Sequence, residues 1–299
     1  GFKKAFSELV LLILNSSDKI KVEQVKLSEI KAMIETFSIK EEKFVNETYY
    51  LNLGVSFNKK KIFKYLEGKN IFPSIPLKKK ILFIPIIIDE NEKELLIFSN
   101  NKIFSEWNND NSSYHLIEYI LPTEDLEDLS LLKKKYDFIE DYDFKEITSK
   151  YNLKDSIVAL IFKNERDVRI LSKININDDI ILKNQSFTNM DLENSLKIKS
   201  ITNDLKIIYE DYWKKLNQIN TSIKLPINVR VKSSDNKKIL NFENILYNDD
   251  LIYDFSIIKF DKDFVYYQVI FNGTPNNFLN SMNENELNFN TQNVIWTLK

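Results

Sequence analysis

The sequence predicts an α+β chain of several domains, with a central α/β layer and a smaller C-terminal sheet. The first observation is an unbroken apolar run from Ile81 to Ile88, typical of a strand that is covered on both faces. The second is a set of segments in which apolar residues recur every three or four positions, as on one face of a helix. The third is a regular alternation of strands and helices near the C-terminus. Together they predict three modules, at residues 1–72, 80–218 and 226–299.

The first module is predicted to run helix, helix, strand, helix. Apolar residues recur with helical spacing over the first 14 residues, and a second helix is expected from Leu27 to Phe37. Residues 47–57 alternate apolar and polar side chains like a half-buried strand. Lys59 to Glu67 follows as a helix that ends with Gly68 in the left-handed conformation. The strand has no partner within this module, so its partner is expected upstream of the first residue.

The middle module begins with the apolar strand, which spans residues 80–89 and carries Pro85 in its middle. Proline cannot donate to a sheet ladder, so it predicts a strand at an edge or a bulge. Further strands and a meander are expected before residue 187. Asp191 is then expected to cap the longest helix, which covers the sheet. The apolar stripe predicted for this helix is Ile198, Ile201, Leu205, Ile208, Tyr212 and Leu216.

The third module has the clearest pattern. Its predicted order is strand, helix, strand, strand, helix, strand, between residues 227 and 298. This order is the ferredoxin-like βαββαβ arrangement, in which one face of the sheet carries the helices. We expect the opposite, open face to serve for pairing with a partner or a neighbouring domain.

Composition excludes several classes of function. The net charge is −2, so no overall field selects nucleic acid or an anionic membrane. The chain has no Cys, which excludes disulfides, thiolate nucleophiles and cysteine-ligated zinc. Arg occurs only at positions 166, 169 and 230, so lysine is the default basic residue and a weak indicator of phosphate contacts. No apolar run approaches the roughly 18 residues that a membrane-spanning helix requires.

The motifs of nucleotide binding and nucleophilic catalysis are also absent. With only four Gly, the chain contains neither a Walker loop nor a glycine-rich dinucleotide turn. His115 is the only His, and beside the polar stretch NNDNSSY it is expected to be a surface residue rather than a catalytic base. The sequence therefore predicts no catalytic residue, no cofactor and no metal site.

Paired carboxylates leave one enzymatic alternative open, because glycoside hydrolysis needs only two of them. Acidic clusters lie at residues 124–128 and 140–143, each ahead of a predicted helix. Acids there cap free amides and favour the positive end of the helix dipole, so a structural role is the preferred interpretation. The alternative is an enzyme acting on an envelope glycan, through two of Asp125, Asp128, Glu140 and Asp141.

A second alternative is binding of single-stranded nucleic acid. The segment FNKKKIFKYL, at residues 57–66, combines four lysines with three aromatic residues. On a helix most of its apolar side chains point inward and its lysines outward, which is typical of an ordinary solvated surface.

Several stretches occur in a characteristic succession. They are FKKAFSELVLLI, EEKFVNETYYLNLGVSF, ILFIPI with NNKIFSEW after it, LPTEDLED, YNLKDSIVALIF, DYWKKLN and IWTLK. Over nearly the whole chain, their order and spacing resemble a bacterial envelope family known as domain of unknown function 2066, in its alphaproteobacterial form. At fold level, the middle module also resembles the amino-terminal domain of TolB.

The resemblance implies an exported protein of unknown function, with a signal peptide and an additional strand ahead of the first helix. Where the family has Gly-Asp after Leu-Pro, this chain has Thr123-Glu124-Asp125, so Asp125 and Asp128 carry over. The family's tryptophan-containing segment is kept as Trp107. These three residues are the surface candidates.

The leading prediction is a non-enzymatic periplasmic module for interaction or assembly. Its partner is expected to be an envelope protein, and no nucleic acid is expected to bind.

Overall fold

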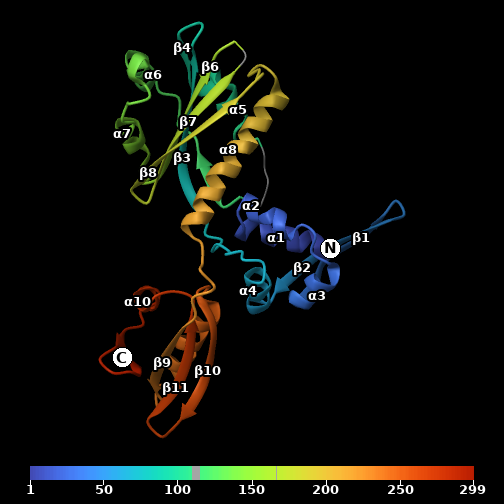
Figure 1. Cartoon of the computed structure of the whole chain (residues 1–299), viewed down its shortest axis with the longest axis vertical. Helices are drawn as coiled ribbons and strands as arrows, with labels where there is room; N and C mark the ends of the chain where they lie inside the picture. Colours follow the sequence, from blue (N-terminus) through green and yellow to red (C-terminus); the bar gives the residue numbers. More distant parts are fainter. Residues whose placement is uncertain (110–114, 166) are drawn as a thin grey trace. The chain divides into compact units, whose positions relative to one another are not determined.

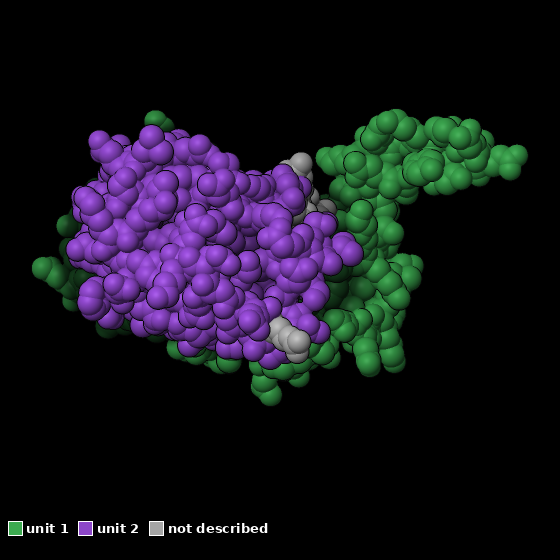
Figure 2. All heavy atoms as spheres, turned by 90° about the horizontal axis from the view of Figure 1, so that it is seen from above, with its two compact units in different colours: residues 1–76, 213–299 green, residues 77–212 purple. Residues whose placement is uncertain are grey.

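The computed structural model describes residues 1–109, 115–165 and 167–299, and it confirms a mixed α+β protein (Figure 1). The chain forms two compact units, coloured separately in Figure 2. Unit 1 comprises residues 1–76 and 213–299, and unit 2 comprises residues 77–212. Unit 2 is therefore inserted between two segments of unit 1. None of the helices described combines the length and the apolar character that crossing a bilayer demands.

The N-terminal part of unit 1 packs short helices around one apolar core. Its helices are α1 (Phe2–Ile13), α2 (Ser16–Lys19), η1 (Ile20–Val22), α3 (Leu27–Met33) and α4 (Lys59–Glu67). The buried side chains at the centre of this core are Phe6, Val10, Leu14, Val22, Ile30, Met33, Ile62, Phe63, Leu66 and Ile71. The side chain of Asn58 accepts a hydrogen bond from the Lys61 amide and so caps α4.

Two strands leave this core as an antiparallel hairpin, β1 (Ile34–Val45) and β2 (Thr48–Phe57). The expected upstream partner for the second strand is wrong, because β1 is that partner. The helix predicted to reach Phe37 ends at Met33, where the chain becomes extended and alternates its side chains. Gly68 is right-handed at φ −61°, whereas Asn70 takes the left-handed conformation at φ 55°.

The C-terminal part of unit 1 is a five-stranded sheet with two helices. Its elements are β9 (Leu225–Lys232), α9 (Asn236–Asn248), β10 (Ile252–Phe260), β11 (Phe264–Phe271), α10 (Pro275–Glu284), β12 (Phe289–Asn290) and β13 (Trp296–Leu298). The strand order is β10-β11-β9-β13-β12, with β13 parallel to β9 and the other pairs antiparallel. In place of the single closing strand predicted from the sequence, the structure has two short antiparallel strands, β12 and β13.

Unit 2 is built on a mixed sheet with helices on both faces. Its strands are β3 (Lys79–Asp89), β4 (Glu94–Leu96), β5 (Ile117–Ile120), β6 (Ser156–Lys163), β7 (Val168–Ile176) and β8 (Asp179–Phe187). Its helices are η2 (Phe98–Asn100), α5 (Lys102–Glu106), α6 (Leu126–Lys134), η3 (Tyr136–Phe138), α7 (Lys145–Thr148), η4 (Ser149–Tyr151) and α8 (Ser195–Leu216). The order is β4-β3-β6-β7-β8, and β5 also pairs with β3.

The strand β3 is central, so the edge position inferred from Pro85 is wrong. On one side β6 pairs with it from Leu82 to Asp89. On the other side β5 pairs with residues 79–82 and β4 with residues 87–89. Pro85 lies in the gap between these two short partners, where a missing N–H donor costs no ladder bond. The Asn101 side chain fills this gap, because its Nδ2 donates to the Pro85 carbonyl at 3.0 Å.

The long helix α8 covers one face of this sheet, as the sequence predicts. Its first turn is capped by Asn194, whose Oδ1 accepts from the amides of Leu196 and Lys197, and not by Asp191. The buried stripe is Ile198, Ile201, Leu205, Tyr209 and Trp213. After Leu205 the buried positions continue in steps of four residues to Tyr209 and Trp213. The predicted Ile208, Tyr212 and Leu216 are therefore not part of the buried stripe. Tyr209 contacts β7 through a 2.7 Å hydrogen bond with Ser172.

Candidate functional site

The β1–β2 hairpin has one apolar face. Its pairing register places Phe44 opposite Tyr49 and Phe37 opposite Val55, with all four side chains on the same side of the ribbon. We call the apolar side chains of this side the hairpin face. They are Phe37, Ile39, Phe44, Tyr49, Leu51, Leu53 and Val55.

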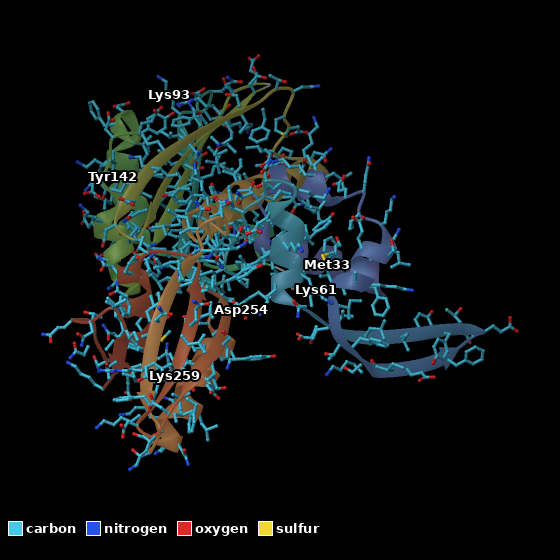
Figure 3. All side chains as sticks on the ribbon, turned by 60° about the horizontal axis from the view of Figure 1, so that its bottom comes forward. Met33, Lys61, Lys93, Tyr142, Asp254 and Lys259 are labelled. Carbon is cyan, nitrogen blue, oxygen red and sulfur yellow. The ribbon has the colours of Figure 1, made fainter. Side chains whose placement is uncertain are left out.

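Most of the hairpin face is exposed to solvent. The exposed fractions are 60% for Phe37, 56% for Ile39, 71% for Phe44, 54% for Tyr49 and 43% for Leu51. Figure 3 shows the two strands as a ribbon that extends from α3, on which Met33 is labelled. At the base of the ribbon, Phe2 of α1 packs edge-on against Phe37, with ring centroids 5.3 Å apart. The cover provided by α1 thus stops at the base.

One acidic residue, Glu42, lies among the apolar side chains of the hairpin face. The Tyr49 hydroxyl forms a hydrogen bond with Glu42, which raises the pKa of Tyr49. On the opposite side of the ribbon, Glu41 forms an ion pair with Lys43. The hairpin is therefore amphipathic. Its apolar side carries one carboxylate, and its polar side carries positive and negative side chains.

The turn of the hairpin holds two residues in the left-handed conformation. Asn46 has φ 49° and Glu47 has φ 60°. A two-residue turn with both φ values positive matches the right-handed twist of the strands it joins. Asn tolerates this conformation, whereas Glu at the second position is strained relative to Gly. The strain at Glu47 accompanies a tight turn that pairs Val45 with Thr48 and so fixes the register of the two strands.

The exposed area of the hairpin face is large enough to bind another surface. An aromatic side chain has about 150–250 Å² of surface, so the five most exposed side chains of this face present roughly 500 Å² to water. The largest apolar patch on a typical monomer is roughly 300–600 Å² and often has a function. A two-stranded hairpin is also marginally stable by itself in water. Covering the hairpin face would both bury apolar area and stabilise the ribbon.

The acidic candidates Asp125 and Asp128 lie at the start of α6 and share one cation. Asp125 caps the helix by accepting from the amides of Glu127 and Asp128. The Lys150 ammonium lies 2.9 Å from Asp125 and 2.7 Å from Asp128. Asp128 is 2% exposed, so it is a buried residue and not a surface candidate. Asp125 thus has the capping role preferred from the sequence, and Asp128 lies in the first turn of the helix.

The hydrogen bond from Lys150 is the first cause that holds the pKa of Asp125 below its usual range. Glu140, in the second acidic cluster, pairs with Arg169. This arginine also lies over the Phe162 ring, at 4.0 Å from its centroid. In both clusters, therefore, at least one carboxylate is occupied by a cation.

Trp107 is fully buried, so the sequence-based placement at the surface is wrong. It stacks on Phe83 of β3 with ring centroids 3.7 Å apart, and Tyr119 and Tyr209 pack around the pair. The residue follows α5, which places it over the sheet beneath α8. Its role is to fill the core on that face.

His115 lies beside a hollow of about 820 Å³ in unit 2. Its Nδ1 is 3.9 Å from the buried carboxylate of Glu210, which accepts a 2.8 Å hydrogen bond from the Ile117 amide. The hollow is lined by three successive lysines, of which Lys79 pairs with Asp155 and Lys80 with Glu118. The cations of this hollow are thus partly neutralised.

Within the residues described, no cluster of three or more metal-ligating side chains is present. Comparisons with protein families, with curated proteins and with solved structures found no match for this chain.

Sequence reasoning located the second strand of the hairpin but missed the hairpin face. The signal was present, since Phe37, Ile39, Leu51 and Leu53 alternate with polar residues on both sides of the turn. The usual marker, a glycine within the turn, is absent here because the turn residues are Asn46 and Glu47.

Proposed function

We propose that the protein is a non-enzymatic interaction module of the bacterial envelope, and that the hairpin face is its docking surface for another protein. The observation that carries this proposal is the exposed apolar side of an otherwise isolated two-stranded ribbon. Its periplasmic location and its membership of the domain of unknown function 2066 family rest on the sequence resemblance alone.

The chemistry of the hairpin face indicates the kind of partner. Apolar and aromatic side chains supply contact area, and aromatic residues are enriched at the energetic centre of protein interfaces. Glu42 is the charged group on this face, so a partner surface with a cation opposite it is favoured over a purely apolar one. The free backbone groups along the outer edges of the ribbon can also pair with a strand of the partner.

The fold-level proposals are narrower. We propose that β9, α9, β10, β11 and α10 form a variant of the ferredoxin-like unit, in which β12 and β13 replace the fourth strand. The parallel pairing of β13 with β9 is a departure from that arrangement. We also propose a likeness of unit 2 to the amino-terminal domain of TolB, supported by its mixed sheet with helices on both faces.

The two alternative functions lack a supporting observation of this kind. A carboxylate enzyme would use two of Asp125, Asp128, Glu140 and Asp141, but Lys150 pairs with the first two and Arg169 pairs with Glu140. For nucleic acid binding, the lysine-rich α4 has Lys60 paired with Asp254 and Lys59 bonded to the Asp249 carbonyl.

The proposal is tested by site-specific photo-crosslinking of the full-length protein in its native host. A photoreactive phenylalanine at Phe44 lies on the hairpin face, and the same group at Tyr50 lies on the opposite side of the ribbon. Both native side chains are exposed, at 71% and 58%. We expect a discrete adduct with an envelope protein from position 44 and not from position 50.

Fractionation of the same cells tests the location. The adduct and the free protein are expected with the periplasm. Equal adducts from both positions, or recovery of the protein with the cytosol, would contradict the proposal.

A further inference from the structure

The outer edge of β1 is unpaired among the residues that the structure describes. This strand belongs to a two-stranded sheet, in which β2 is its hydrogen-bonded neighbour. Every residue of β1 after Ile34 is exposed. The edge is 12 residues long and contains no proline, so its backbone groups are available for pairing.

We propose that β1 pairs antiparallel with β1 of a second copy of this chain, which gives a continuous four-stranded sheet in the order β2-β1-β1-β2. This inference goes beyond the proposed function, since it names a second copy as the occupant of an edge rather than a partner of the hairpin face. The argument rests on the register of β1 and on its charges.

The register of such a pair is constrained by a bulge at Lys40. The pairing of β1 with β2 shifts between Ile39 and Glu41, so Lys40 is the extra residue. The Lys40 side chain lies on the polar side of the ribbon, where a β-carbon added at Gly54 would meet both its Cε and the Ser38 hydroxyl. Lys40 and Glu41 therefore share the polar side.

A two-fold axis between Lys40 and Glu41 satisfies both constraints. It places each Lys40 opposite Glu41 of the other copy, on the polar side, so that two ion pairs form. On the apolar side, it places each Phe37 opposite Phe44 of the other copy. Aromatic pairs and opposite charges at facing positions stabilise antiparallel strands.

Neighbouring registers are less favourable. A shift by one residue would place apolar side chains of one copy on the polar side of the other. A shift by two residues, with the axis between Glu41 and Glu42, would oppose Lys40 to Lys43 on the polar side, and it would pair Glu41 with Glu42, whose side chain lies on the other side of the ribbon. Like charges directly opposite destabilise a strand pair. The alternation of side chains between the two sides of the ribbon and the charge pattern together favour one register.

Pairing also relieves the weakness of the isolated hairpin. Three or more strands with an apolar face form a stable sheet, whereas two are marginal. The hairpin faces of both copies then lie on the same side of the merged sheet. The merged apolar surface is roughly 1,000 Å², comparable to the roughly 800 Å² that each partner buries in a standard protein interface.

The test is the molar mass of the full chain in solution, by analytical ultracentrifugation at low salt. We expect the wild-type protein to sediment as a dimer at micromolar concentration. In the Lys40→Glu variant, a carboxylate replaces the ammonium opposite Glu41 of the other copy. In the Glu41→Lys variant, an ammonium replaces the carboxylate opposite Lys40 of the other copy. Each variant alone is expected to dimerise about 10-fold more weakly or worse, since two pairs change from attraction to repulsion.

An equimolar mixture of the two variants is the decisive sample, because the heterodimer restores opposite charges at both positions. Lys61→Glu, an equal charge change on the exposed face of α4, is the matched control and is expected to leave the dimer unchanged. A monomeric wild-type protein, or a mixture no more associated than its components, overturns the proposal. A monomeric protein would overturn the dimer alone. The proposed docking of an envelope protein on the hairpin face would still be decided by photo-crosslinking at Phe44.

The register has its own test, because the chain has no native Cys. The proposed pairing places Ser38 opposite Lys43 of the other copy, at the separation of about 4.5–5.5 Å between β-carbons that facing residues have. Ser38→Cys mixed with Lys43→Cys is therefore expected to form a disulfide under oxidation. Either variant alone is expected to cross-link far less, and equal cross-linking in all samples contradicts this register.

Discussion

Asn101 connects α5 with β3 in unit 2, and its replacement is expected to be among the most damaging polar substitutions in the chain. The residue is fully buried. Its Oδ1 accepts hydrogen bonds from the amides of Ile103 at 2.9 Å and Phe104 at 3.1 Å, which caps α5. Its Nδ2 donates to the Pro85 carbonyl at 3.0 Å, in the gap left between β4 and β5.

The magnitude follows from these bonds. Loss of an N-cap side chain costs about 1 kcal/mol. A buried partner left without its hydrogen bond costs about 1–3 kcal/mol, and the Pro85 carbonyl becomes such a group. We therefore expect Asn101→Ala to lower the free energy of unfolding of unit 2 by about 2–4 kcal/mol, a large part of the roughly 5–15 kcal/mol of a typical domain.

Asn194→Ala is the matched control. This asparagine also accepts from two backbone amides at a helix start, those of Leu196 and Lys197, but its side chain is exposed. It is expected to cost about 1 kcal/mol. Urea unfolding followed by circular dichroism measures both variants. Equal losses for the two would refute the reasoning that Asn101 stabilises the gap beside Pro85.

Asn101→Asp separates the two roles of the side chain. It keeps an oxygen acceptor for α5 but loses the donor and places a carboxylate beside the Pro85 carbonyl. Burial raises the pKa of such a carboxyl above its unfolded value, so the folded state binds the proton more tightly. The deficit relative to wild type is therefore expected to shrink as the pH falls, because the protonated acid can donate.

Three further predictions concern other regions. Glu47→Gly removes a strained left-handed residue, so the hairpin is expected to gain about 0.5–1 kcal/mol, seen as slower amide exchange in β1 and β2; faster exchange would contradict this. Lys150→Met leaves the Asp128 carboxylate buried without its cation and is expected to lower the free energy of unfolding in urea, whereas Asp125→Asn keeps an N-cap side chain and is expected to lower it less. A hydrogen bond from Lys259 is the first cause that lowers the pKa of Asp261 to about 2. Its stabilisation is thus complete above about pH 4 and is lost as the pH falls toward 2, and an NMR titration of Lys259→Met should show that pKa returning toward its ordinary value.

The strands and helices with strong periodicity could be predicted from the sequence. The run from Ile81 to Ile88 is buried, as a strand covered on both faces should be. None of its Ile, Leu and Phe side chains is more than 4% exposed. Its place in the sheet could not be predicted, because it depends on two short partners, β4 and β5, that leave a gap at Pro85. The rule that places proline at sheet edges assumes that a central strand is paired continuously on both sides. On one side of β3 the pairing is interrupted at Pro85.

The hairpin shows a different limit. Phe37 falls at a helical spacing from Ile30 and Ile34, so local periodicity extends the helix, while pairing with Val55 draws the residue into a strand. The burial of Asp128 was likewise beyond prediction, since the cation that makes it tolerable, Lys150, comes 22 residues later. Tertiary pairing decides both cases.

The insertion of unit 2 within unit 1 has a consequence for the order of folding during synthesis. Lys214 donates to the Leu11 and Leu14 carbonyls at the end of α1, the amide of Ile219 binds the Pro73 carbonyl, and Ile219 belongs to the N-terminal core. The first 76 residues thus emerge from the ribosome long before the residues that complete their core. Unit 2 lacks this delay, because its own sheet is encoded contiguously. The helices around Phe6 must therefore wait, with apolar side chains unprotected, until more than two-thirds of the chain has been made, which is the interval in which a chaperone has the most to bind.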